Sequence, residues 1–259
     1  MKSKWFVILL CMLFGLTFCS SGVRYYIGYN EDLNAFSDKD EISKSDARGG
    51  SFYEVYYSSG RINYYNYYKN DKLFSKHVFV YDDAKYPIIK KNLDLKNKIN
   101  SIEYYDDNNG LNKVVKYDQK GQIASEEMFK PLPLSSKDFY PDYNIGKSYL
   151  DKKIDYFNNQ NKKNIFYYQY FVLEKKLHQK ILKMEEYSNN MLINKYLYFY
   201  NNSAIKYKVE SYNLNKLNKI TFYNRNDIIE EEHLFDDKGK LSIKRYFNRL
   251  GKLVKEDKN

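Results

Sequence analysis

The side chains that most often carry out chemistry in proteins are few in this chain and lie far apart along it. The three histidines, His77, His178 and His233, do not have the spacing of a two-histidine metal motif, and none lies beside a candidate nucleophile in the sequence. Each is therefore expected on the surface of a strand. The sequence contains no nucleophile elbow, phosphate loop or dinucleotide-binding fingerprint. We expect no enzyme: no catalytic residue, no cofactor and no metal site.

Two acidic stretches have the residue types of a cation site without its spacing. The stretch from Asp106 to Gly110 is similar to the start of a calcium-binding loop, but the downstream glutamate that completes such a loop is missing. We expect it to be a turn between two strands. The three glutamates from Glu230 to Glu232 alternate between the two faces of a strand, so they cannot hold one ion together.

The N-terminus has the pattern of an export signal. Lys2 and Lys4 precede an uncharged apolar run of 14 residues, Trp5 to Phe18. A helix needs about 20 apolar residues to span a bilayer, whereas the core of a signal peptide is shorter. The sequence therefore predicts a signal peptide over residues 1–18.

Acylation of Cys19 is the one chemical modification that the sequence predicts. Leu16 lies three residues before Cys19, as in the lipobox of bacterial lipoproteins, although Phe18 is bulkier than the small residue usual before that cysteine. The alternatives are a signal peptide cut elsewhere and an uncleaved anchor. We expect an exported, palmitate-bearing lipoprotein in the cell envelope, on the periplasmic or surface face of the outer membrane. Cys11 would be discarded with the signal, so the mature chain could form no internal disulfide.

The charge indicates which partners to expect. The formal net charge is +10, and removal of Lys2 and Lys4 lowers it by two. Basic exported proteins can attract lipid headgroups, acidic polysaccharides or nucleic acids through screened Coulomb forces. Lysines here are interleaved with acidic residues rather than gathered in a run, so most are expected to be solvated, and no specific nucleic-acid partner is expected.

Aromatic residues recur at nearly constant spacing along the second half of the chain. The positions are Tyr200, Tyr212, Tyr223, Phe235 and Phe247, and an earlier series is Tyr105, Tyr117 and Phe129. A period of about 12 residues fits one strand and one tight turn. The side chains between turns alternate from face to face, most clearly from Ile205 to Glu210, as in a half-buried antiparallel strand.

The turns of the repeat have a defined residue pattern. Three units read aromatic, Asp or Asn, two further residues, Gly, one residue, then Ile or Leu; their glycines are Gly121, Gly239 and Gly251. The acidic or amide side chain caps the turn through backbone hydrogen bonds, and the glycine supplies a positive φ. Other units lack the glycine, because Asn and Asp also tolerate the left-handed conformation.

These units resemble the tyrosine-aspartate repeats of Rhs-type proteins and, more loosely, the MORN-like hairpin repeats of antitoxin-like bacterial proteins. The resemblance covers the chain from about residue 51 and implies repetitive β architecture. It leaves the activity open, because one fold hosts many functions.

The expected fold is therefore all-β: an antiparallel meander of strand-turn repeats, forming an extended or curled sheet. We expect a lipidated flexible tether over 19–50 and a β-repeat domain over 51–259, with a candidate split at 130–150, where three of the four prolines gather. The segment 174–186 fits a short amphipathic helix or a strand, and continuity of the repeat favours the strand. The first strands are expected over Phe52–Tyr57, Ile62–Tyr68, Leu73–Tyr81, Ile99–Tyr105, Leu111–Tyr117 and Ile123–Phe129.

Three functions from different classes agree with these features. The first is a membrane-anchored protein that binds an acidic polymer or a protein over an extended sheet surface. The second is a repeat-type immunity, antitoxin-like or structural protein of the envelope whose partner is another bacterial protein. The third is an enzyme whose site is assembled by the proline-rich segment. We expect the first; its ligand and the oligomeric state are not fixed by the sequence.

Overall fold

The computed structural model describes residues 21–30, 34–82, 86–131, 148–157, 161–173 and 176–259. The chain divides into two compact units, Met1–Gly110 (unit 1) and Leu111–Asn259 (unit 2). Among the described residues the only helical element is one turn of 3-10 helix, η1 (Asp38–Asp40), and the other eighteen elements are strands. The predicted all-β antiparallel meander is confirmed. No helix in the described parts of the chain has the length and hydropathy needed to cross a membrane.

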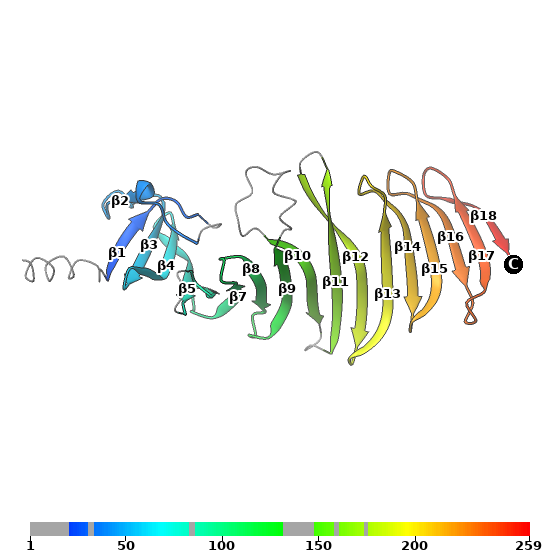
Figure 1. The fold of residues 1–259 in the computed structure, drawn as a ribbon, viewed down its shortest axis with the longest axis horizontal. Coiled ribbons are helices and arrows are strands. Elements are labelled where there is room, and N and C mark those ends of the chain that lie inside the picture. Colours follow the sequence, from blue (N-terminus) through cyan, green and yellow to red (C-terminus); the bar gives the residue numbers. More distant parts are fainter. Residues whose placement is uncertain (1–20, 31–33, 83–85, 132–147, 158–160, 174–175) are drawn as a thin grey trace, which may run out of the picture. The chain divides into compact units, whose positions relative to one another are not determined.

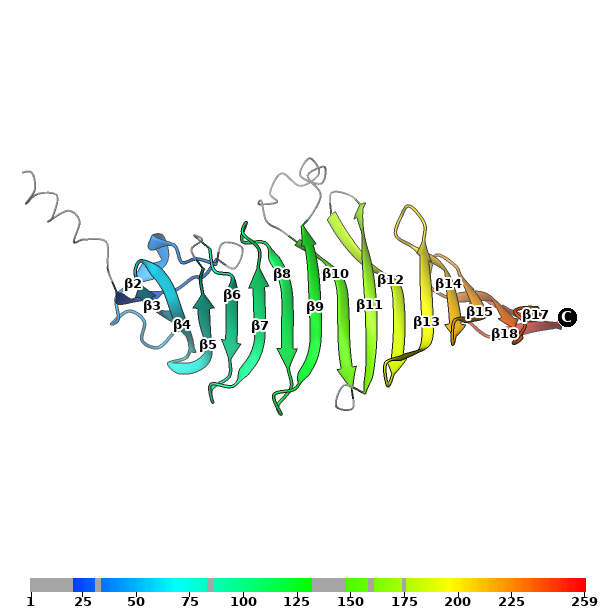
Figure 2. The same cartoon turned by 60° about the horizontal axis from the view of Figure 1, so that its bottom comes forward.

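Unit 1 contains the first seven strands (Figures 1 and 2). They are β1 (Gly22–Tyr26), β2 (Glu41–Ile42), β3 (Ser51–Ser58), β4 (Arg61–Lys69), β5 (Lys72–Val80), β6 (Ile89–Leu93) and β7 (Ile99–Tyr105). From β3 onward each strand pairs antiparallel with the next one along the chain. β1 departs from this order, because it pairs with both β2 and β3.

The aromatic core of unit 1 includes a residue from the range expected as a tether. Tyr26 of β1 is almost fully buried, and it packs with Val55, Tyr65 and Phe79 of the neighbouring strands. The ring of Phe36 lies 4.8 Å from that of Tyr26, centroid to centroid. Burial of such large apolar surfaces fixes the segment to the sheet. The expectation of a flexible tether over 19–50 is corrected accordingly: ordered structure begins by Gly22, before residue 51.

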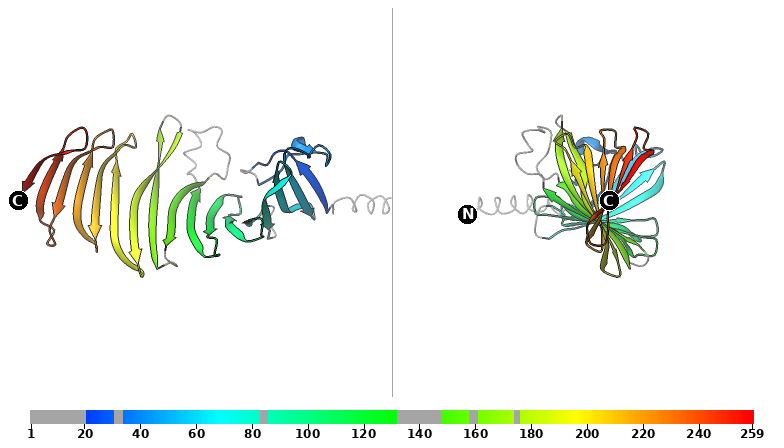
Figure 3. Two further views of the ribbon diagram at one scale, coloured as in Figure 1. Left: turned by 180° about the vertical axis from the view of Figure 1, so that it is seen from behind. Right: turned by 90° about the vertical axis from the view of Figure 1, so that its right-hand side faces the viewer.

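Unit 2 contains eleven strands within its described residues (Figure 3). They are β8 (Leu111–Tyr117), β9 (Ile123–Pro131), β10 (Ser148–Phe157), β11 (Lys162–Leu173), β12 (Lys176–Ser188), β13 (Met191–Tyr200), β14 (Lys206–Asn213), β15 (Lys216–Tyr223), β16 (Ile229–Phe235), β17 (Leu241–Phe247) and β18 (Leu253–Lys258). Each pairs antiparallel with the next. Since these strands contact mainly their neighbours along the chain, the sheet of unit 2 is a single layer.

A single layer has no separate core, and its side chains cover one another. Val114 and Val115 are both buried although consecutive strand residues face opposite ways. Long tyrosine and lysine side chains shield their cross-strand neighbours on both faces, which explains why so many residues of unit 2 are half-buried.

The same capped turn occurs seven times in the described parts of the chain. An Asp or Asn accepts hydrogen bonds from the backbone N–H groups two and four residues later, and the residue three positions later has a positive φ. The capping residues are Asp94, Asp106, Asp118, Asn201, Asn224, Asp236 and Asn248. The φ angles of Gly121, Gly239 and Gly251 are 81°, 77° and 72°, the left-handed values that the turn prediction required.

The ambiguous segment 174–186 falls mostly in β12, so the strand prediction is confirmed within the described residues. The pairing shifts between Tyr167 and Tyr168, which lie opposite Lys183 and Ile181. Leu182 is therefore the extra residue of a β-bulge, and it is exposed. This bulge interrupts the alternation of side chains and explains the mixed helix and strand pattern of the sequence.

The division into units and one strand differ from the prediction. The division into units falls after Gly110 rather than within 130–150. Pro131 ends β9 opposite Ser148 of β10, so the chain on either side of the proline-rich segment belongs to neighbouring strands; the other prolines of that segment lie outside the described residues. The sequence prediction also omitted β6, whose polar residues show no alternation.

Candidate functional site

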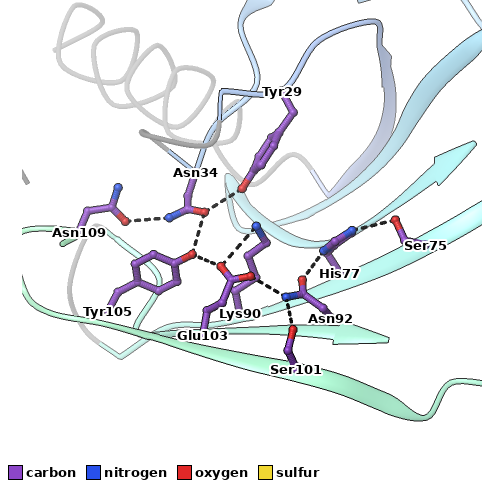
Figure 4. Close-up of polar contacts among 10 residues, drawn as sticks. All are labelled: Tyr29, Asn34, Ser75, His77, Lys90, Asn92, Ser101, Glu103, Tyr105 and Asn109. Carbon is purple, nitrogen blue, oxygen red and sulfur yellow. Dashed lines mark hydrogen bonds and ion pairs between the residues drawn. The ribbon is translucent and has the colours of Figure 1, made fainter. Parts of the chain in front are cut away.

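The most connected group of polar side chains in unit 1 lies on one face of β5, β6 and β7 (Figure 4). His77 pairs with Asn92, Asn92 pairs with Ser101, and Lys90 pairs with Glu103 across these strands. Directly paired residues of antiparallel strands share a face and bring their side chains within contact distance. Strand register alone therefore assembles residues that are up to 26 positions apart in the sequence, from His77 to Glu103.

Glu103 is the centre of this network. Its carboxylate accepts hydrogen bonds from Asn92 Nδ2, at 2.6 Å, and from the hydroxyl of Tyr105. The ammonium group of Lys90 lies 3.6 Å from the same carboxylate and 5.2 Å from the ring centroid of Tyr29. Lys90 is only 7% exposed, so its charge needs both partners to offset the loss of hydration. Lys90 and Glu103 together form an ion pair with no net charge on this face of the sheet.

The hydrogen bonds around His77 define its tautomer. Asn92 uses Nδ2 to donate to Ser101 and Glu103, so its Oδ1 is the acceptor for His77 Nδ1–H. His77 Nε2 then accepts from the hydroxyl of Ser75, at 2.9 Å. Burial, with the nearby Lys90 cation, lowers the pKa of His77 to about 4, so the ring is neutral at pH 7.

Ser75, His77 and Asn92 thus have the hydrogen-bond polarity of a nucleophile, a base and an orienting group. The low pKa of His77 works against this chemistry, because an effective general base has a pKa near the working pH. The ring of Tyr65 stacks on His77 with centroids 4.4 Å apart, which holds the imidazole in place. The arrangement supports a structural role best. That the protein has no catalytic residue stays a prediction.

Sequence reasoning missed this cluster. Ser75 and His77 are two residues apart on a strand and therefore share a face, a signal that was present in the sequence. Asn92 could not be found in the same way, since its place opposite His77 depends on the register of β6.

Asn34 extends the network beyond the strands. It accepts a hydrogen bond from Tyr29 at 2.8 Å and donates to Asn109 Oδ1 at 3.1 Å. Asn109 belongs to the turn that begins at Asp106, whose carboxylate accepts from the backbone N–H of Gly110. The structure thus places the acidic stretch 106–110 in a capped turn, as predicted. No group of three His, Cys, Asp or Glu side chains among the described residues has the arrangement of a metal site.

An open hollow of 540 Å³ lies beside Asn34 in unit 1. Its walls include Phe36, Tyr57 and Arg61. The guanidinium of Arg61 lies 5.4 Å from the ring centroid of Tyr81 and donates to the backbone carbonyl of Asp82. The walls of the hollow therefore mix aromatic, small and polar residues, and the Arg61 guanidinium is already engaged by neighbouring groups.

In unit 2 the recurrent polar group is a lysine, a glutamate and a tyrosine at alternate positions of one strand. On β12 the Lys183 ammonium lies 2.8 Å from the Glu185 carboxylate, which also accepts hydrogen bonds from Tyr187 and Tyr167. Burial raises the pKa of the Glu185 carboxyl, but these hydrogen bonds and the Lys183 charge outweigh it, so the pKa ends below its usual value.

The same group recurs on β14, where Lys208 and Tyr212 hold Glu210 at 2.9 and 2.8 Å. Burial raises the pKa of Glu210 too, and the same kinds of hydrogen bond bring it below the usual value. The carboxylates of these groups are thus ionised and neutralised from within the sheet.

Lysines of unit 2 also lie against aromatic rings. The Tyr167 ring lies between two ammonium groups, with Lys183 at 3.8 Å and Lys152 at 5.3 Å from its centroid. Lys195 lies 4.3 Å from the ring centroid of Tyr212. A cation above a ring gains electrostatic attraction while its head group stays hydrated. The face that carries these residues therefore presents alternating rings and positive charges.

The remaining residues singled out in the sequence stay separate. His178 is exposed on β12, opposite Phe171. His233 contacts the Glu231 carboxylate on the same strand face, whereas Glu232 pairs with Lys219 at 3.2 Å. Glu231 and Glu232 thus have different partners, as consecutive residues on opposite faces of the strand. Cys19 lies outside the described residues.

No family model and no curated protein matches the chain. Among solved structures, a porin-like protein from Bacteroides uniformis is 10% identical, with 91% of this chain and 92% of that one covered and a TM-score of 0.28. A mutant of S. aureus TarM, in complex with fondaparinux, alpha-GlcNAc-glycerol and UDP, is 14% identical, with 57% and 20% covered and a TM-score of 0.21. A TcdB2-TccC3-Cdc42 chain is 10% identical, with 77% and 13% covered and a TM-score of 0.19.

This chain spans about a fifth of the TarM chain and about an eighth of the TcdB2-TccC3 chain. TM-scores of this size assign neither a shared fold nor a shared activity. What the structure itself establishes is the coarser feature, a long antiparallel meander of tandem strands.

Proposed function

We propose that the protein is an exported, lipid-anchored binding protein of the bacterial cell envelope whose ligand is an acidic polymer. The export part rests on the charged start, the short apolar run and the spacing of Leu16 from Cys19. Within this proposal the repeats are strand-turn units of the Rhs-like or MORN-like kind.

The anchor has a geometric consequence for unit 1. β1 begins at Gly22, three residues after Cys19. Three extended residues reach about 10 Å. A lipid on Cys19 therefore holds unit 1 close to the headgroups, with no long tether between the membrane and the folded protein.

The single observation that carries the ligand assignment is the charge arrangement of the unit 2 sheet. Carboxylates such as Glu185 and Glu210 are neutralised by lysines of the sheet itself and accept hydrogen bonds from its tyrosines. Lys152 and Lys195 lie over rings and have no ion-pair partner among the described residues. Such lysines can exchange water for the anionic groups of a long polymer while the rings support its apolar surface.

Binding of polymers tests this proposal. The processed protein is purified in mild detergent and titrated with polygalacturonate, heparin, neutral dextran and duplex DNA at about 50 and 500 mM salt. We expect one of the acidic glycans to bind at low salt and to weaken at high salt, because exposed charges are screened over about 8 Å at physiological ionic strength and less above it. Binding of dextran with no salt dependence, or of no polymer at all, contradicts the proposal; preference for DNA contradicts the glycan assignment.

Two variants distinguish polymer binding at the sheet face from a general effect of net charge. Lys195→Gln removes a cation over the Tyr212 ring, and Lys238→Gln removes one from an exposed turn. Both lower the net charge by one. The proposal requires the first substitution to weaken polymer binding more than the second.

Exposed apolar residues near the C-terminus favour a second candidate, a protein partner. Leu250 is 79% exposed, and Leu253 and Val254 of β18 are also exposed. Exposed apolar surface can mark a protein contact. An immunity or structural role of the antitoxin-like type predicts that Leu250→Ser abolishes capture of a single envelope protein and leaves glycan binding unchanged.

A further inference from the structure

A pocket of 360 Å³ lies at one end of the unit 2 sheet. It is bounded by β12, β13 and the start of β14, with the turns that join β13 to β14 and β15 to β16. Strands alternate in direction, so these two turns lie at the same end of the sheet (Figure 1). The volume is at the small end of the range of ligand sites and is sufficient for a single sugar ring.

The pocket carries an excess of positive charge. Lys180, Lys206 and Arg225 line it together with one carboxylate, Asp227. Lys206 lies 2.9 Å from Asp227 and 3.8 Å from the ring centroid of Tyr223, so that cation is already engaged. Lys180 and Arg225 have no ion-pair partner among the described residues. Two positive charges are therefore left to meet a ligand.

Two tyrosines give the pocket aromatic walls. Burial raises the pKa of Tyr198, and it raises the pKa of Tyr200 to about 12, so both rings are neutral at pH 7. The hydroxyl of Tyr200 donates to the backbone carbonyl of Ile181 at 2.9 Å. This bond restrains the ring, which lines the pocket. Aromatic rings in such a wall can pack against the apolar face of a sugar.

At this pocket the backbone keeps the repeated turn, but the residue type at one position departs from it. The fourth position of the seven capped turns has a positive φ and is occupied by Asn97, Asn109, Gly121, Ala204, Asp227, Gly239 and Gly251. Ala204, with φ of 55°, is the one member whose residue type does not favour this conformation. It is only 7% exposed and lines the pocket.

The identity of residue 204 affects the space available in the pocket. An Asn or Asp at this position would place a larger polar side chain against the pocket, and a glycine would remove the methyl wall. Strained residues that persist in a fold are often found at binding sites. Asp227, at the equivalent position of another turn, also lines the pocket and pairs with Lys206.

We propose that this pocket binds one anionic sugar residue of the acidic polymer, with its carboxylate or sulfate facing Lys180 and Arg225 and its ring against Tyr198 and Tyr200. This assignment rests on the proposed function and adds a defined subsite to it. A neutral sugar leaves the two cations without a partner, and a cationic one is repelled by them.

Short oligosaccharides test the subsite directly, because they are too small to bridge the whole sheet. The processed protein is titrated calorimetrically with trigalacturonate, a sulfated uronate disaccharide and neutral maltotriose. We expect one acidic oligosaccharide to bind and maltotriose not to bind. The stronger of the two acidic probes identifies the anionic group as carboxylate or sulfate.

Arg225→Gln has a matched control in the same structural position of another turn. Arg225 follows the capping residue Asn224, and Arg249 follows the capping residue Asn248. Only Arg225 lines the pocket. We expect Arg225→Gln to weaken the acidic oligosaccharide by about tenfold or more, the loss of a hydrogen bond to a charged group, and Arg249→Gln to change it less than about twofold. Ala204→Asn, which keeps a residue compatible with positive φ, is expected to block the oligosaccharide without unfolding the protein.

The outcomes separate the subsite from the wider proposal. Equal losses in Arg225→Gln and Arg249→Gln, or polymer binding with no oligosaccharide binding, overturn the pocket and leave polymer binding intact. Absence of binding to both polymer and oligosaccharide overturns the proposed function as well.

Discussion

Replacing Gly239 by Ala isolates the backbone requirement of the repeated turn. Gly239 has φ of 77°, and a Cβ at this position would meet no atom within 4 Å. No clash is introduced, so the change acts only through the conformation of the chain. The left-handed conformation costs a residue with a Cβ roughly 1–2 kcal/mol. Alanine also reduces the conformational entropy of the unfolded chain, which stabilises the folded state by about 0.4–1 kcal/mol. The net expectation is a destabilisation of about 1 kcal/mol.

The assay is thermal and urea unfolding beside two comparison variants. A loss of about 1 kcal/mol corresponds to a fall in Tm of about 2–4 °C for a chain of this size. Gly50→Ala is the matched control, since Gly50 also has open space around it but lies outside the left-handed region; we expect it to be neutral or slightly stabilising. Gly239→Asn should lose little, because Asn97 and Asn109 hold the same turn position at φ of 60° and 61°. Equal effects of Gly239→Ala and Gly50→Ala would refute the turn assignment.

Three further predictions concern the turn cap, the histidine and the anchor. Asp236→Ala removes the acceptor for the N–H groups of Lys238 and Lys240 and should lower the unfolding free energy by about 1 kcal/mol, whereas Asp236→Asn should be nearly neutral in the same urea titration. The folded pKa of His77, about 4, lies below the unfolded value of about 6.5, so the unfolded state binds more protons between these pH values. The free energy of unfolding should therefore fall as the pH is lowered from 6.5 to 4. His77→Gln should flatten that part of the curve of stability against pH. Cys19→Ala should release the protein from membranes, and mass spectrometry of the wild type should find acylated Cys19 at the N-terminus; an unmodified N-terminus elsewhere rules this out.

The sequence predicted those parts of the fold that depend on local signals. Strands such as Leu111–Tyr117 were predicted with the bounds that the structure has, because side-chain alternation and capped turns are encoded within about 12 residues. β1 and β2 were not predicted. Their place is set by pairing of β1 with β3 and by burial of Tyr26, which connect segments about 30 residues apart.

The polar sites depended even more on contacts between strands. The row from Ser75 through His77 to Asn92 needs the register of β5 on β6, and β6 lacks the alternation that identifies a strand. The pocket of unit 2 is formed by three strands and two turns. Ala204 differs in type from the residues at the equivalent position of the other six capped turns, and this equivalence follows from the capping hydrogen bonds.

Hydrogen–deuterium exchange of the membrane-anchored protein, with and without the acidic glycan that binds it, tests the central claim most directly. Our account predicts slower exchange in β12 to β14 and in the turn from Asn224 to Ile228, with unit 1 unchanged. Protection confined to unit 1, around the hollow beside Asn34, would contradict it.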